Sequence, residues 1–220
     1  MFPKSQLAKD ELKKFFFTYP KIFFKRGELL IHPQETLHSC FLIATGLIRI
    51  FTITAEGKEV TITLLASSIN NELVLGIGNF VDKYYVEALS DVEMIRVSQN
   101  DLVSFIEKIP TALVALYMMQ IYILRALEAV IEVLKTGSAV ESISLALYFL
   151  AANLGVKHKD GIAIEVKLTH QELANITGLT RETVTGQINA LQKKGIVTIK
   201  KNVILIKDMD ALDKNLIFKA

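Results

Sequence analysis

The sequence predicts an α+β protein whose strands lie in the N-terminal half and whose helices dominate the C-terminal half. Residues 28–97 hold β-branched and aromatic runs broken by turn residues such as Gly46 and the AEGKE stretch at 55–59, a pattern typical of strands. Helical periodicity begins after Ser98, where Asp101 suggests a helix start, and continues to about Lys135. Two short helices and a hairpin are then expected between residues 168 and 206. We therefore expect a β-rich domain, a long helix and a small helical domain.

Composition excludes several classes of protein. With 51% hydrophobic residues, the chain of 220 residues can bury a substantial core, so disorder is not expected. Its single cysteine, Cys40, excludes an intrachain disulfide and the multi-thiolate sites of iron–sulfur clusters or structural zinc within one chain. Residues 1–14 alternate charged and apolar side chains and lack the features of a secretory signal. We expect a cytoplasmic protein.

The segment from Ala112 to Leu134 is nearly long and apolar enough to span a membrane. Four polar residues argue against that interpretation: Gln120, Arg125, Glu128 and Glu132. An apolar seam with alternating spacings of four and three is instead typical of helices that pair, and it comprises Leu113, Tyr117, Gln120, Leu124, Leu127, Ile131 and Leu134. We predict a dimerisation helix at this seam and no membrane contact.

A second apolar face of the same helix needs a separate partner, since a helix apolar nearly all round must be covered on more than one side. This face comprises Val114, Met118, Ile121 and Tyr122. We expect it to pack on the chain's own domain.

Residues 136–142 are small and polar enough for a hinge, the following helix is expected to end at Gly155, and the stretch 155–161 is expected to be a polar loop.

The net charge of +2 hides an asymmetry between the two halves. Residues 135–220 carry 12 Lys and Arg against 8 Asp and Glu, a net charge of +4, whereas residues 1–134 carry −2. A surplus of this size is weak support for a polyanionic partner by itself, because solvated charged faces are common. It gains weight from the motif that it surrounds.

The stretch LTHQELANITGLTRETVTGQI, residues 168–188, predicts a helix-turn-helix. Thr169 and Glu172 form a capping box, so the first helix should begin near His170, and Gly178 should end it. Thr180 can cap a second helix from Arg181 that buries Val184, Ile188 and Leu191 and stops at Gly195. Residues 196–206 then read as a hairpin with Lys200, Lys201 and Asn202 at its tip, which makes a winged version.

The N-terminal face of this second helix has side chains suited to DNA. Arg can donate to guanine O6 and N7, Glu can accept from cytosine N4, and Thr can offer a methyl to thymine or a hydroxyl to phosphate. The predicted base contacts are Arg181, Glu182 and Thr185. The predicted backbone contacts are Thr169, His170, Gln171, Thr183, Lys200 and Lys201. The alternative is an ordinary helical corner with Arg181 and Glu182 solvated, which the wing and the basic C-terminal half disfavour.

Four segments resemble the Crp/Fnr family of bacterial transcription regulators in order and spacing, over nearly the whole chain. They are FLIATGLIRIF, AEGKEVTITLL, the long apolar helix and LTHQELANITGLTRETVTGQINALQKKGIV. The resemblance implies an effector-sensing β-roll, jelly-roll-like, at 1–110, a dimerisation helix at 111–136 and a winged helix-turn-helix at 137–220. It also implies a homodimer that reads a palindromic operator in double-stranded DNA and contacts RNA polymerase. Such a protein is a ligand-gated switch rather than an enzyme.

The sequence departs from the cyclic-nucleotide-sensing members of that family. Those members hold the ribose and cyclic phosphate with a Gly-Glu pair and, about ten residues later, an Arg-Ser or Arg-Thr pair. Here Asn71 precedes Glu72, and Asp82 and Lys83 occupy the Arg-Ser place. An acidic residue at the phosphate position would repel that ligand, so neither cyclic AMP nor cyclic GMP is expected to bind.

Another effector remains open, and a small anionic metabolite is the candidate. Lys83 lies where the branch that senses 2-oxoglutarate has an Arg, but that branch's second Arg, on the dimer helix, aligns with Ile123, and Arg125 is only nearby. The candidate pocket comprises Glu72, Lys83, Tyr84, Arg125 and Glu128. The plainer interpretation, which we favour, makes Lys83 a surface residue and Arg125 part of an ion pair between subunits.

Other candidate sites are weaker. His38 and Cys40 alternate on an expected strand, but two ligands are too few for a metal, and a core cysteine beside a satisfied histidine is commoner. No metal is therefore predicted and no cofactor is certain. Gly76-Ile77-Gly78 lacks the rest of a dinucleotide fingerprint. No nucleophile–base pair is found, so an enzyme is not expected. The remaining alternative is a small-molecule-binding protein whose winged helix contacts other proteins.

Overall fold

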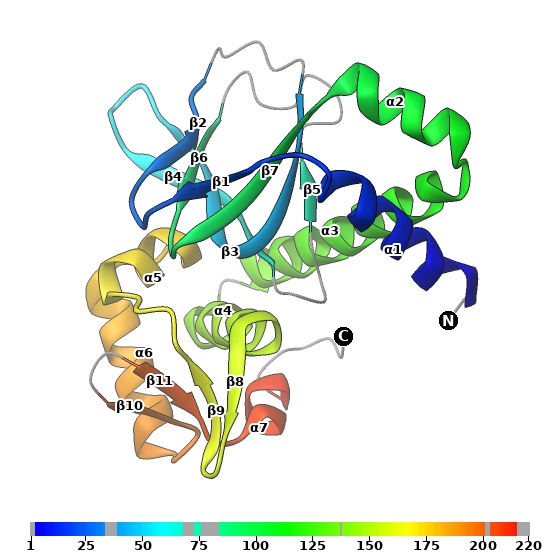
Figure 1. Cartoon of the computed structure of the whole chain (residues 1–220). Helices are drawn as coiled ribbons and strands as arrows, with labels where there is room; N and C mark the ends of the chain where they lie inside the picture. Colours follow the sequence, from blue (N-terminus) through cyan, green and yellow to red (C-terminus); the bar gives the residue numbers. More distant parts are fainter. Residues whose placement is uncertain are drawn as a thin grey trace. The chain divides into compact units, whose positions relative to one another are not determined.

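The computed structural model describes residues 3–33, 39–67, 73–75, 84–136, 138–200 and 203–214. Its contacts divide the chain into two compact units (Figure 1). The first comprises Met1–Ile50 and Leu65–Arg125, and the second comprises Phe51–Leu64 and Ala126–Ala220. The α+β fold class predicted from the sequence is confirmed, because a curled antiparallel sheet precedes a helical C-terminal region.

The N-terminal sheet is built around one long strand, β3. Its strands are β1 (Lys21–Phe24), β2 (Leu29–Ile31), β3 (Ser39–Ile53), β4 (Glu59–Ser67), β5 (Leu73–Leu75), β6 (Tyr85–Ala88) and β7 (Val92–Ser98). They run in the order β1-β7-β3-β6-β2, with β4 and β5 also pairing with β3. The pairing joins residues far apart in sequence, such as Ser39 with Ser98. The predicted turn at 55–59 separates β3 from β4 and has Gly57 at a φ of 78°.

Successive residues of β3 and β7 belong alternately to two apolar clusters. Leu42 lies opposite Ile95, and both join a cluster with helix α1 (Pro3–Phe16), helix α2 (Gln99–Lys108) and the start of α3 (Thr111–Thr136). The next pair, Ile43 and Met94, joins a second cluster with residues of β2 and β6. Successive residues of a strand point to opposite faces, so each face of the sheet has its own core.

Two elements precede the strands expected from residue 28 onward. Helix α1 buries Ala8, Leu12 and Phe16, which recur every four residues along one helical face. Strand β1 pairs with β7 and begins at Lys21. The expected helix start after Ser98 is confirmed, since the Ser98 hydroxyl accepts a hydrogen bond from the Asp101 amide at 3.0 Å and caps α2.

The face of α3 that packs on its own unit is not the predicted one. Ala112, Ala115 and Leu116 are buried, whereas Val114 is 49% and Met118 is 41% exposed. Small alanines allow the helix to approach the domain closely, and the apolar surface beside the seam is left uncovered. The predicted packing of Val114 and Met118 on the chain's own domain is therefore wrong, whereas Ile121 is half-buried and the Tyr122 side chain lies outside the description. In the described part of the chain, Thr111–Glu132 is a helix long and apolar enough to cross a membrane, by length and composition only.

Within the second unit, the elements from α4 onward form a winged helical domain. Its elements include α4 (Ala139–Leu154), β8 (Gly155–His158), β9 (Gly161–Ile164), α5 (His170–Thr177), α6 (Arg181–Lys193), β10 (Val197–Lys200), β11 (Val203–Ile206) and α7 (Met209–Lys214). The four strands form an antiparallel sheet in the order β10-β11-β9-β8. Helix α4 packs against α5, α6 and α7.

Two expectations for this unit are wrong. The hinge expected at 136–142 is shorter, because Ser138 caps α4 and residues from Ala139 onward are helical. The polar loop expected at 155–161 is instead the hairpin β8–β9. Gly161 permits this hairpin, since its φ is 142° and an added Cβ would lie 2.1 Å from the Ile206 carbonyl oxygen. Polar residues on β8 are exposed at the sheet edge, which explains why the stretch reads as a loop.

Candidate DNA-binding site

The helix-turn-helix begins with the predicted capping box. The Thr169 hydroxyl accepts from the Glu172 amide at 3.1 Å, and the Glu172 carboxylate accepts from the Thr169 amide at 2.7 Å. These two bonds satisfy two backbone donors that the start of α5 would otherwise leave unpaired. Gly178 ends the helix in the left-handed conformation, with a φ of 71°. The predicted limits of the first helix are confirmed.

Helix α6 starts and packs as its sequence predicts. Thr180 caps it by accepting from the Thr183 amide at 3.2 Å, and Arg181 is its first residue. Val184 and Ile188 are fully buried, so one face of the helix is held by the core of the unit. The helix ends at Lys193, two residues before Gly195. The residues at its N-terminal end are thereby presented on a fixed, capped helix.

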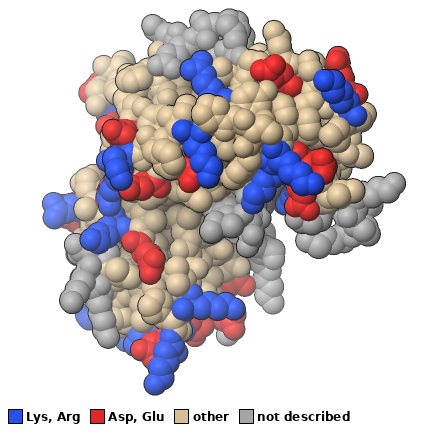
Figure 2. Space-filling model, in the orientation of Figure 1, with Lys and Arg blue, Asp and Glu red and all other residues tan. Residues whose placement is uncertain are grey.

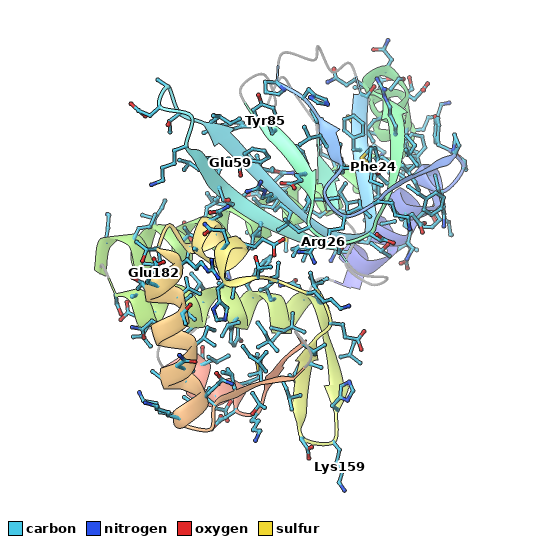
Figure 3. All side chains as sticks on the ribbon, turned by 90° about the vertical axis from the view of Figure 1, so that its left-hand side faces the viewer. Phe24, Arg26, Glu59, Tyr85, Lys159 and Glu182 are labelled. Carbon is cyan, nitrogen blue, oxygen red and sulfur yellow. The ribbon has the colours of Figure 1, made fainter. Side chains whose placement is uncertain are left out.

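Both principal base-contact candidates lie exposed at this end. Arg181 and Glu182 are exposed, and Figure 3 shows Glu182 at the N-terminal end of α6. Thr185, one turn after Arg181, is half-buried. Lys159, by contrast, lies at the tip of the β8–β9 hairpin, away from this end of the helix (Figure 3). The sequence predicts that Arg181, Glu182 and Thr185 share one helical face. All three lie within α6, so their spacing puts them on the same face.

The backbone-contact candidates surround the same end of the motif. Thr169 and His170 lie at the start of α5, and the exposed Gln171 side chain donates to Asn175 Oδ1 at 3.0 Å. The hydroxyls of Thr183 and Thr180 are 2.9 Å apart. Lys200 ends β10, and Lys201 lies outside the described residues, as does Asn202. The predicted hairpin itself is confirmed, with Val197 opposite Ile206.

One contact within the motif was not expected from the sequence. His170 Nδ1 lies 2.8 Å from Thr185 Oγ1, and that hydroxyl donates to the Arg181 carbonyl oxygen at 2.8 Å. The two side chains are 15 residues apart and belong to different helices. No periodicity or cap pairs such residues, so only the packing of α5 on α6 could reveal the bond.

Gly186 lies on the exposed surface of α6, directly after Thr185. A Cβ added there would have no heavy atom within 4 Å among the neighbours considered. The fold therefore does not require glycine at this position. Its effect is to leave this part of the helix surface without a side chain.

The predicted dimer seam is largely exposed in the single chain. Leu113, Tyr117, Leu124, Ile131 and Leu134 are each more than half exposed, Gln120 is exposed, and Leu127 is half-buried. An apolar stripe of this length on one helix is unusual for a surface that faces water alone.

The effector-pocket candidates are only partly described. Tyr84 packs against the apolar cluster that contains Ile43 and Met94, while Arg125 and Glu128 are exposed on α3. Glu72 and Lys83 lie outside the described residues, as do Asn71, Asp82 and Gly76-Ile77-Gly78. Tyr84 is therefore the one member of this candidate pocket that the described structure places against the sheet core.

The metal candidates can be tested only in part. Cys40 is buried, and its burial raises the pKa of the thiol to about 11. His38 lies outside the described residues. Within the described ranges, no group of three or more His, Cys, Asp or Glu side chains could hold a metal ion.

Charge on the visible surface is mixed. Figure 2 shows Lys and Arg interspersed with Asp and Glu over this face, without a large region of one sign. This agrees with the small net charge of +2. Local placement of cations near α6, rather than a general positive field, would therefore decide any contact with a polyanion.

Comparison with known proteins gives the family. A model of the cyclic nucleotide-binding domain matches residues 21–109, and a model of the Crp-like helix-turn-helix domain matches residues 144–214. The anaerobic regulatory protein of Bacillus subtilis is 30% identical over 169 residues, which span 74% of this chain and 68% of that protein. The global nitrogen regulator of Synechococcus elongatus is 28% identical over 194 residues, 87% of each chain.

Solved structures support the same fold. FixK2 from Bradyrhizobium japonicum superposes with a TM-score of 0.76 at 18% identity, covering 92% of this chain and 98% of that one. A Crp-family transcriptional regulator from Thermus thermophilus superposes with a TM-score of 0.70 at 20% identity, covering 89% and 96%. These structures thus share the fold of this chain. The chain belongs to the Crp/Fnr family of DNA-binding transcription regulators, which are not enzymes.

Proposed function

We propose that this regulator binds a palindromic operator as a homodimer and reads each half-site with the N-terminal end of α6. The observation that carries the proposal is the exposed Arg181–Glu182 pair at the start of a helix capped by Thr180 and anchored by buried Val184 and Ile188. A helix held in this way can enter a major groove without losing its own packing. The rival role, a winged helix that contacts proteins, is disfavoured by the family assignment.

The side chains divide into two roles. Arg181 offers paired donors to guanine, Glu182 accepts from cytosine, and Thr185 lies on the same face. Thr169, His170, Gln171, Thr183, Lys200 and Lys201 are assigned to phosphates. Thr169 suits this role, because its hydroxyl oxygen accepts from Glu172 and its hydrogen can point to a phosphate.

The test compares two variants that remove one positive charge each from α6. Arg181→Ala should lower specific affinity by about 1–3 kcal/mol and relax selectivity at one base pair. Lys193→Ala, at the far end of the same helix, should leave base selectivity unchanged. Fluorescence anisotropy over a salt series measures both effects. Equal losses for the two variants on every sequence would contradict base reading by Arg181.

Phosphate contacts have a different signature. Lys201→Ala should weaken binding to all sequences alike and reduce the salt slope by about one, since one counterion fewer is released. Glu182→Ala should instead relax discrimination at a single position. An unchanged salt slope for Lys201→Ala would remove the wing tip from the contact surface.

Dimerisation is assigned to the exposed seam of α3. Leu124→Glu should shift the protein toward monomer in sedimentation experiments and abolish high-affinity operator binding. Leu124 is 52% exposed, and Val103 on α2 is 54% exposed, so Val103→Glu is a matched control that should leave the dimer intact. A monomeric wild type, or equal effects of the two variants, would contradict the assignment.

We further propose that the effector is not a cyclic nucleotide. Asp82 and Lys83 occupy the place of the cyclic-phosphate clamp, so calorimetry should detect no micromolar binding of cyclic AMP or cyclic GMP, and neither should alter DNA affinity. A small anionic metabolite such as 2-oxoglutarate is the candidate, and Lys83→Ala should abolish its effect on DNA binding. Tight binding of a cyclic nucleotide would overturn this part of the proposal.

The protein is proposed to act in the cytoplasm through RNA polymerase. Support comes from its membership in a family of transcription regulators and from the single, buried cysteine. Transcription in vitro from a promoter that carries the selected operator, with purified polymerase, tests this directly. An effect on transcript yield that needs the operator is expected, and no effect at saturating protein would contradict it.

A further inference from the structure

The Thr185 hydroxyl is used within the protein. Its oxygen lies 2.8 Å from the Arg181 carbonyl oxygen and 2.8 Å from His170 Nδ1. A carbonyl oxygen can only accept, so the single hydroxyl hydrogen is donated to Arg181. His170 Nδ1 must then carry a hydrogen and donate it to the Thr185 oxygen. The hydroxyl is thus held from both sides, by its own helix and by the first residue of α5.

This arrangement limits what Thr185 can offer to DNA. A hydroxyl that has given its hydrogen to Arg181 cannot donate to the acceptors of guanine, adenine or thymine, nor to a phosphate. The other group on the Thr185 Cβ is its Cγ2 methyl. Because two partners hold the oxygen, the methyl has one preferred position as well.

Thr185 also has a suitable place on the helix. It follows Arg181 by four residues and Glu182 by three, which puts all three on one face of α6. Thymine is distinguished in the major groove by its C5-methyl, which favours apolar contact with a group such as a threonine methyl. Gly186, the next residue, leaves open space beside Thr185.

We propose that Thr185 reads a thymine through its methyl group, and that His170 is the positioning residue that fixes it. The proposal rests on the proposed function, since it assigns chemistry to the same helix face. It adds a specificity to the half-site: a thymine recognised by its methyl, next to the base pairs read by Arg181 and Glu182. It also gives His170 a role in base recognition that does not require a phosphate contact.

The test replaces each thymine of the selected operator, one at a time, with deoxyuridine, which lacks only the methyl. Wild-type protein should lose about fourfold in affinity at one symmetric position per half-site, the value of one buried methyl-sized group. Thr185→Ser keeps the hydroxyl and loses the methyl, so it should bind the thymine and deoxyuridine operators equally. Thr185→Val replaces the hydroxyl with a second methyl and should still prefer thymine.

His170 is tested by rescue. His170→Ala should reduce the preference for thymine, and His170→Asn should restore it, because its side-chain amide can donate near the place of Nδ1. Thermal unfolding confirms that each variant is folded. Wild type that ignores deoxyuridine at every position, or Thr185→Ser that still prefers thymine, would overturn the proposal. Failure of the wild type to select any operator would instead reject the proposed function.

Discussion

The helix-turn-helix and the curled sheet of this protein are organised by interactions of different range. In the helix-turn-helix, each helix begins at a hydroxyl that accepts from an amide three residues later, as at Thr169 and Thr180. In the curled sheet, stability depends on pairs such as Lys21 with Ile95 and Leu29 with Glu87, which lie more than fifty residues apart. The starts of α5 and α6 are therefore set by nearby sequence, whereas the curled sheet is set by the register of distant strands.

The difference has a functional consequence. The cap of a recognition helix fixes where the helix starts. Single substitutions on its exposed face can therefore change which bases it reads without loss of the fold. A residue of the sheet contacts partners from several strands, so substitutions there alter packing on both sides of the pair. Specificity should therefore be easy to change by mutation in the C-terminal unit, and stability should be easy to lose in the N-terminal one.

The largest expected effect comes from the sheet core. Ile95 is fully buried opposite Leu42, and Ile95→Ala should lower the free energy of unfolding by about 2–5 kcal/mol, because it leaves a cavity that strands from distant segments cannot close. Ile22→Ala on β1 is the control, since Ile22 is 37% exposed and should cost much less. Denaturant unfolding measures both. Similar losses for the two variants would contradict this account of the core.

The helix caps should have a smaller and more uniform effect. Thr169→Ala, Thr180→Ala and Ser98→Ala should each lower stability by about 1 kcal/mol, because each leaves a helix amide without its acceptor. Ser98 caps α2 in the other unit, so an equal loss there would show that caps act locally in both units. Ser104→Ala, on the exposed surface of α2, is the control and should not destabilise. A loss at Ser104 as large as at Ser98 would refute the cap interpretation.

Gly186 should respond in the opposite direction. Gly186→Ala should stabilise the protein by about 0.5–1 kcal/mol, because the position is helical and an added Cβ meets no neighbour. Gly161→Ala is the matched control and should destabilise, since its φ is 142° and its Cβ would collide with the Ile206 backbone. Thermal unfolding separates the two signs. Destabilisation by Gly186→Ala would mean that the fold needs this glycine.

The smallest effect is expected from an exposed ion pair across the edge of the sheet. Lys25 Nζ lies 2.8 Å from Asp91 Oδ2, and this hydrogen bond lowers the pKa of Asp91. A carboxyl whose pKa is lowered in the folded state stabilises it above the unfolded pKa, and that contribution is lost as the pH falls through the folded value. Both side chains are largely exposed, so water and salt screen the pair.

The double change Lys25→Ala with Asp91→Ala should therefore leave the unfolding midpoint at neutral pH within error, and the acid limb of the stability profile should shift only slightly. Unfolding at pH 7 and at pH 3 checks both statements. A large loss at pH 7 would show that this pair, although exposed, organises the edge of the sheet.

Some parts of the molecule could be predicted from the sequence, and others could not. The limits of α5 and α6 follow from Thr169, Glu172, Gly178 and Thr180, because caps and left-handed glycines are short-range signals. The hairpin β8–β9 could not be recognised, since both strands are only four residues long, β8 is largely exposed, and β9 depends on pairing with β11. The packing face of α3 was missed because apolar residues surround the helix and only the domain beneath it selects one side.

The candidate site shows the same division. Arg181 and Glu182 could be predicted, because a helix start fixes where they lie. The bond between His170 and Thr185 could not, since it forms only when α5 crosses α6. Exposed candidates for base contact can be found from local patterns, whereas a contact between side chains of two helices requires the packed structure.

Selection of binding sites from random duplexes tests whether α6 reads the operator. We expect a two-fold symmetric site whose half-sites lie about one helical turn apart, because paired copies of α6 must enter successive major grooves on one face of the duplex. One G·C pair should dominate each half-site, and the base pair that faces Gly186 should be nearly unconstrained, since glycine has no side chain to read it. Selection that returns no symmetric motif, or two strongly fixed G·C pairs with one opposite Gly186, would contradict the account.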